Sequence, residues 1–174
     1  RCFFVWRVKY PSWEELERAV NFAHSQNQSV IIVTHDVGLC KGNKPGRGNM
    51  LMAQALKRVT DKHPLVPVLA QLGVARAAKE LGVRITETIG PPEVNTPLNR
   101  STEGYNSMTV VAAQKRWCEE HGMFQALALT LAIPLHMGRV QWIMEKEGFT
   151  VFPIPLLSLR SRDYADRESL YFSI

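Results

Sequence analysis

The stretch that decides the fold is SVIIVT, residues 29–34, a continuous run of mostly apolar and β-branched side chains. A strand with one face in water alternates apolar and polar residues, so this run predicts a strand that is buried on both faces. A second buried strand is predicted over 124–132, which contains the run ALALTLA. Strands of this kind belong to parallel sheets with helices on both faces.

Helix-like and strand-like segments alternate around these two runs. Ser12 and Glu15 have the spacing of a capping box, so the first helix is expected to begin there. Further helices are predicted over 49–62, 73–81, 103–121 and 134–147, and strands over 29–34, 65–70, 83–89, 124–132 and 149–154. Ser101 or Thr102 is expected to cap the longest helix. This order predicts one domain over 1–174, a doubly wound, three-layer α/β sandwich with a mostly parallel five-stranded sheet, that is, a Rossmann-like fold.

The composition is that of a globular protein. Of 174 residues, 45% are hydrophobic and 21% are charged, which excludes disorder as the main state. The sequence contains no run of eighteen apolar residues, so no membrane span is expected. The net charge of +5 is mild and is not gathered in one stripe. Nucleic-acid binding is therefore ranked well below the two functions given at the end of this section.

The cysteines indicate a reducing compartment. Cys2, Cys40 and Cys118 are odd in number and far apart, and no CxxC or Cys/His spacing appears, so a zinc site and a disulfide framework are not expected. Reduced thiols fit a cytoplasmic location. Because the sequence begins with Arg1 rather than methionine, the question whether a targeting segment precedes it is left open. The sequence does not indicate an oligomeric state.

Polar side chains follow both buried runs, where open parallel sheets bind their ligands. If the two strands are neighbours, the residues after each of them converge. His136 and Arg139 follow the second run, three residues apart in the opening turns of a helix. There they would share one face near the positive end of the helix dipole and would hold an anion. The alternative is that Arg139 pairs with a surface carboxylate and His136 caps a turn.

Thr34, His35 and Asp36 end the first run. His35 and Asp36 would supply a general base, or a hydrogen-bonding pair for a ribose or a phosphate. In the alternative interpretation, Asp36 satisfies loop amides and His35 is a partly buried spacer. The loop at 42–48 is rich in glycine, but it matches neither established phosphate-loop pattern and is expected to be a surface loop. Trp117 is expected to pack in the core or at its edge rather than to serve as a stacking platform.

The second half of the chain resembles a known family. The segment LALTLAIPLHMGRVQWIMEKEGFTVFPIP, residues 127–155, is similar to the signature of the SanA/YdcF/ElyC-like family: a strand, a His-Met-x-Arg-like motif that opens a helix, then a glycine and a strand ending in prolines. The family also has an upstream loop with an acid and a T-x-x-N-type motif. Residues 93–99 (EVNTPLN) match that motif, and Asn106 is an alternative match for the asparagine of the motif. The resemblance covers residues 83–155 and is poorer before them.

The resemblance implies a Rossmann-like fold with one pocket at the strand ends. It places His136, Arg139 and either Asn99 or Asn106 on the pocket wall. It adds Glu93 and Thr96 to the expected ligand-binding residues, beside Thr34 from the strand end. One member of the family is associated with S-adenosylmethionine, which makes that compound a candidate cofactor; no reaction is established for the group.

Together these observations predict a protein that binds a small anionic or nucleotide-like ligand. If it is an enzyme, hydrolysis or group transfer on a phosphorylated substrate is expected, with His136, His35 and Asp36 as catalytic residues. The alternative is a regulatory module that holds the ligand, of the S-adenosylmethionine type, without turnover.

Overall fold

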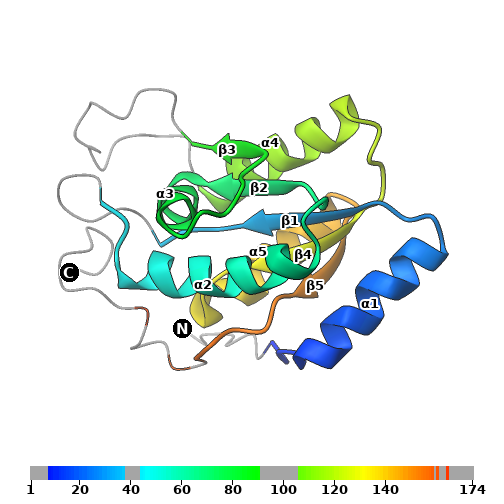
Figure 1. The fold of residues 1–174 in the computed structure, drawn as a ribbon. Helices are drawn as coiled ribbons and strands as arrows, with labels where there is room; N and C mark the ends of the chain where they lie inside the picture. The colour runs from blue at the N-terminus through cyan, green and yellow to red at the C-terminus, as the bar shows by residue number, and fades with distance from the viewer. Residues whose placement is uncertain (1–7, 38–43, 91–105, 159, 161–163, 165–174) are drawn as a thin grey trace, which may run out of the picture.

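The computed structural model describes residues 8–37, 44–90, 106–158, 160 and 164. Its middle layer is a five-stranded sheet, parallel throughout, in the order β3-β2-β1-β4-β5 (Figure 1). The strands are β1 (Val30–Thr34), β2 (Val68–Gln71), β3 (Glu87–Ile89), β4 (Leu127–Leu131) and β5 (Thr150–Pro153). The helices are α1 (Trp13–Ser25), α2 (Arg47–Lys62), α3 (Leu72–Glu80), α4 (Ser107–Glu120) and α5 (Pro134–Lys146). This is the α/β class of a Rossmann-like, three-layer sandwich, as the alternation of segments predicts.

Two apolar cores lie on the two faces of the sheet, because successive strand residues point to opposite sides. Val30 and Ile32 of β1 pack in one core with the inner faces of α1, α2 and α3. Ile31 and Val33 pack in the other core, with α4 and α5. In Figure 1, α2 and α3 lie in front of the sheet and α4 and α5 lie behind it.

The centre of the sheet is β1, whose five residues are all buried. It lies between β2 and β4, and its last residue, Thr34, is paired with Leu131 at the end of β4. This confirms that the two most apolar runs are neighbours. The chain leaves β1 for α2 in front of the sheet and leaves β4 for α5 behind it, so the connections diverge between these two strand ends. Such a point is where open α/β sheets form their binding crevice.

The helix starts agree with the sequence in one case and differ in another. The capping box of α1 is confirmed: Ser12 Oγ accepts from the amide of Glu15 (3.1 Å), and Glu15 Oε2 accepts from the amide of Ser12 (2.6 Å). The cap expected at Ser101 or Thr102 is wrong, because α4 begins after Asn106, and 101 and 102 lie outside the described residues. An asparagine at this position can accept from two orphan amides of the first turn.

The outer strands are shorter than the apolar patterns predict. Residues 83–89 were expected to form one strand, but only Glu87–Ile89 pair, with Leu69, Ala70 and Gln71 of β2. The neighbouring strand sets this limit, since β2 itself starts at Val68, after a turn in which Val66 donates to His63 O (3.2 Å). The position of β3 at the sheet edge is as predicted.

Within the described ranges, none of the helices has both the length and the apolar character that crossing a lipid bilayer requires.

Candidate functional site

The candidate site is the crevice at the carboxyl ends of β1 and β4. His35, the residue after β1, donates its amide to Leu131 O (2.8 Å) and so stays attached to β4. Helix α5 begins three residues after β4, with Pro134 in its first turn and Ile133 as its N-cap. Isoleucine has no side-chain oxygen, and the first turn of α5 contains no acid. The positive end of the α5 dipole therefore meets the crevice without a side-chain cap.

His136 and Arg139 lie on the opening turns of this helix. The His136 side chain is half-buried and Arg139 is exposed. Burial lowers the pKa of His136 below its usual range, and the positive charge of Arg139 lowers it further. No described carboxylate lies within ion-pair distance of Arg139, so the alternative of a surface ion pair is not seen among these residues. The site thus offers a guanidinium and an imidazole that is largely neutral at pH 7.

His35 lies beneath them, in the layer of α4 and α5. Its side chain is 3% exposed, and Gln114, on the inner face of α4, is fully buried. Burial lowers the pKa of His35 to about 3; the charge of His136 acts in the same direction, and the nearby Gln114 amide offsets part of the shift. Although the two side chains are close, no hydrogen bond of regular geometry joins them. Both ring nitrogens of His35 and both amide atoms of Gln114 are buried without a hydrogen-bond partner.

Asp36 and Thr34 lie on the other side of the sheet. Asp36 Oδ2 accepts from the amide of Gly73 at the start of α3 (2.7 Å), and Thr34 Oγ1 accepts from the amide of Gln71 (3.1 Å). The amide of Asp36 donates to Gln71 Oε1 (2.9 Å). These bonds tie the end of β1 to the junction of β2 and α3. The structure therefore does not bring Asp36 together with His35. Instead, the Asp36 carboxylate caps the start of α3.

The remaining predicted residues come from the segment before α4. Asn106 is exposed, and its Oδ1 accepts from the amides of Met108 (2.9 Å) and Thr109 (3.2 Å), so its oxygen is used to cap α4. Glu93, Thr96 and Asn99 lie outside the described residues.

Sequence reasoning missed Gln114. The residue lies on the buried stripe of α4 with Val110, Val111 and Cys118, at helical spacing. An amide in an otherwise apolar stripe is a signal that could have been recognised, because buried polar side chains are uncommon and are normally hydrogen-bonded. Cys118, on the same stripe, is 2% exposed, and burial raises the pKa of its thiol to about 11.

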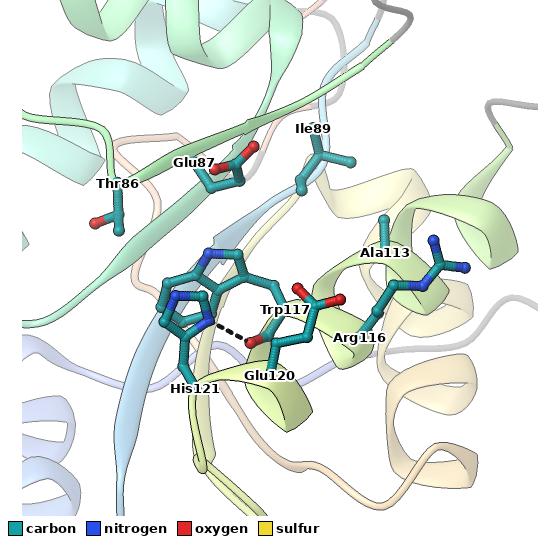
Figure 2. A pocket seen from close by; sticks show the side chains of 8 residues that line it. All are labelled: Thr86, Glu87, Ile89, Ala113, Arg116, Trp117, Glu120 and His121. Atoms are coloured by element: carbon teal, nitrogen blue, oxygen red, sulfur yellow. Dashed lines mark hydrogen bonds between the residues drawn. The ribbon is translucent and has the colours of Figure 1, made fainter.

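A separate pocket of about 470 Å³ lies between the edge strand β3 and the second half of α4 (Figure 2). Its lining consists of Thr86, Glu87, Ile89, Ala113, Arg116, Trp117, Glu120 and His121. The rings of Trp117 and His121 stack with centroids 3.9 Å apart, and His121 Nδ1 lies 2.7 Å from Trp117 O. The charged side chains of this pocket are exposed, in contrast to the buried pair beneath His136. No sequence signal marks it, because it depends on how α4 packs against β3.

In the part of the chain that the structure describes, no three histidine, cysteine or acidic side chains come together in a way that would hold a metal ion.

Comparison of the chain with protein-family models, with curated proteins and with solved structures finds no match in any of the three.

Proposed function

We propose that the crevice between the ends of β1 and β4 binds a small molecule through its anionic group, such as a phosphate. The observation that carries this proposal is the Arg139 guanidinium, which has no ion-pair partner among the described residues and lies one turn from the half-buried His136 on a helix start without a side-chain cap. Three features there favour negative charge: the positive end of the α5 dipole, the guanidinium, and the imidazole once it is protonated.

The depressed pKa of His136 makes this site sensitive to what it binds. An anion beside the ring favours the imidazolium and raises the pKa of His136 toward its ordinary value. Arg139 stays charged throughout, because a guanidinium does not lose its proton in a protein. Arg139 therefore supplies the permanent attraction, and His136 supplies a proton that can be taken up on binding.

The reaction class that suits these residues is hydrolysis or group transfer on a phosphorylated or nucleotide-type substrate. A neutral imidazole is able to take a proton from an attacking hydroxyl, and a guanidinium stabilises charge that develops on phosphoryl oxygens. Membership of the SanA/YdcF/ElyC-like family is part of the same proposal and rests on the motif around His136 and Arg139. The second candidate, a module that holds an S-adenosylmethionine-type ligand without turnover, uses the same pocket.

Thermal unfolding with added inorganic phosphate tests the binding site. Phosphate at ten times its dissociation constant is expected to raise the Tm of the wild-type protein by about 3–6 °C. Arg139→Ala is expected to remove that rise and to leave the Tm without phosphate within about 2 °C of the wild type, since Arg139 is exposed. If the Tm without phosphate instead falls by several degrees, Arg139 has a structural role and the proposal is wrong.

Arg116→Ala is the matched control. It removes the same charge from an exposed arginine, but at the pocket beside β3. Loss of the phosphate effect in Arg116→Ala, with Arg139→Ala unaffected, would move the anion site to that pocket. Screens for phosphatase and nucleotidase turnover, with and without divalent metal, then separate an enzyme from a binding module. For an enzyme, turnover is expected to be lost in His136→Ala.

A further inference from the structure

The buried atoms of His35 and Gln114 are costly to the fold. A buried donor or acceptor without a partner costs about 1–3 kcal/mol, and these two side chains hold four such atoms. Native proteins contain few of them, so a cluster in one place calls for an explanation. The cluster lies where the candidate site lies: His35 follows β1 and its amide is bonded to Leu131, five residues before His136.

The chemistry of the three side chains allows them to form a chain. A neutral imidazole has one N–H donor and one lone-pair acceptor, and a glutamine amide has both a donor and an acceptor. His35 stays neutral down to strongly acidic pH, so it is able to donate to Gln114 Oε1 with one nitrogen and to accept with the other. A protonated His136 has a donor at each nitrogen. One of these is the donor that the free nitrogen of His35 lacks.

We propose that His35 and Gln114 are positioning residues that act through His136: they fix its ring and set the pH at which it charges, and thereby regulate anion binding at the crevice. While His136 is neutral, the chain from Gln114 through His35 is incomplete. When His136 takes a proton from water, its new N–H donates to His35, and the His35 ring turns its own N–H to Gln114. This inference deepens the proposed function, since the anion is what draws the proton onto His136.

Few other charges act on this ring. Arg139 faces it from the same helix and opposes protonation. From α4 the residue that faces His35 is the uncharged Gln114. The ion pair of Lys115 on α4 with Glu147 (2.9 Å) is at the opposite end of α5, where Glu147 is the C-cap. In the proposal, the pair beneath the ring offsets part of the repulsion by Arg139.

The test is the pKa of His136, measured by NMR titration without any ligand. His136→Gln identifies its resonance among the five histidines. In Gln114→Met the pKa of His136 is expected to fall by about half a unit or more, because the His35 ring loses the acceptor for its own N–H when it accepts from His136. The Tm of this variant is expected to stay level or rise, because an apolar side chain of similar size replaces an unsatisfied amide. Gln54→Met, at an exposed position of α2, is the matched control and is expected to change neither value.

His35→Leu tests the order of the chain. It is expected to lower the pKa of His136 as well, and the double variant with Gln114→Met is expected to lower it no further, because Gln114 acts through His35. An unchanged or raised pKa of His136 in both single variants overturns the inference. So does a Tm that falls by several degrees in Gln114→Met while the pKa of His136 stays constant, since that is the result of a purely structural amide.

Sulfate binding separates this inference from the proposed function. Sulfate remains a dianion across neutral and mildly acidic pH, so changes in its affinity report the protein alone. The wild-type affinity is expected to rise as pH falls through the pKa of His136. In Gln114→Met this rise is expected at a lower pH, so that binding at the wild-type midpoint is about twofold to fivefold weaker. Sulfate binding with an unmoved midpoint overturns the positioning role and leaves the anion site. A shifted pKa of His136 without sulfate binding supports the positioning role and removes the anion site.

Discussion

His35 and Asp36 are adjacent in the chain, yet their side chains lie in opposite layers of the sandwich. Asp36 bonds the first turn of α3 in front of the sheet, and His35 lies behind it, with Gln114 of α4. The alternation of a strand continues through these two residues and separates them. A dyad expected from two neighbouring polar residues is therefore not formed, and the two side chains belong to different tasks, one to the fold and one to the crevice.

The Asp36 carboxylate is expected to stabilise the fold and not the ligand. Asp36→Ala removes the acceptor for the amide of Gly73 (2.7 Å), so the free energy of unfolding is expected to fall by about 1 kcal/mol, the usual effect of losing a helix cap. Urea unfolding measures this loss. Asp61→Ala, which removes an exposed i,i+4 partner of Lys57, is the control and is expected to cost about 0.5 kcal/mol or less. Phosphate binding that disappears in Asp36→Ala, with the fold intact, would return Asp36 to the site.

Acid is expected to destabilise the protein through His35. The pKa of its ring is about 3 in the folded protein against 6.5 when exposed, so the unfolded chain binds a proton first as pH falls. The stability due to the neutral, buried ring is complete above pH 6.5 and is lost from there down toward pH 3, by up to about 1.4 kcal/mol per pH unit. Urea unfolding at a series of pH values measures the slope. His35→Leu is expected to flatten it, and an equal slope in both proteins would show that other groups cause the acid sensitivity.

Gly73 is expected to tolerate substitution poorly. A Cβ there would lie 2.6 Å from Asn49 Nδ2 and 2.7 Å from Asp36 Oδ2, so Gly73→Ala crowds the contact of α2, α3 and the end of β1. The expected loss is about 1–3 kcal/mol, measured by urea unfolding. Gly122→Asn is the contrast: its φ of 68° suits asparagine and its surroundings are open, so the loss is expected to stay below about 1 kcal/mol. Equal losses at both positions would mean that the crowding at Gly73 is relieved by small shifts.

The main elements of the fold follow from the sequence because the apolar runs are unambiguous. Buried neighbouring strands form within both stretches, Val30–Thr34 in 29–34 and Leu127–Leu131 in 124–132. The second strand starts later than predicted, since Phe124 is exposed and Gln125 has a φ of 51°. The capping box of Ser12 and Glu15 also forms as its spacing predicts, since it depends on local contacts alone. Boundaries that depend on a partner were less accurate, as the short β3 shows: its length is set by β2 and not by its own residues.

The site was only partly predictable for the same reason. The spacing of His136 and Arg139 fixes their common place on α5, so their convergence on one helix start is a local property. The layer that His35 faces follows from the alternation of β1, but the presence of Gln114 beside it depends on how α4 crosses the sheet. Gln114 is 79 residues further along the chain than His35, and no local pattern connects them. The pocket between β3 and α4 arises from packing in the same way.

Both borders of the sheet discourage pairing with another chain. On one side, β3 offers three residues, with Glu87 and Thr88 exposed. On the other, the amides of Thr150 and Ile154 donate inward to β4, so the nitrogen of Pro153 faces outward, where it has no hydrogen to give. Short, charged or proline-bearing borders are how β proteins avoid stacking into larger sheets. If copies of this protein associate, we expect their contact to avoid these two strand edges.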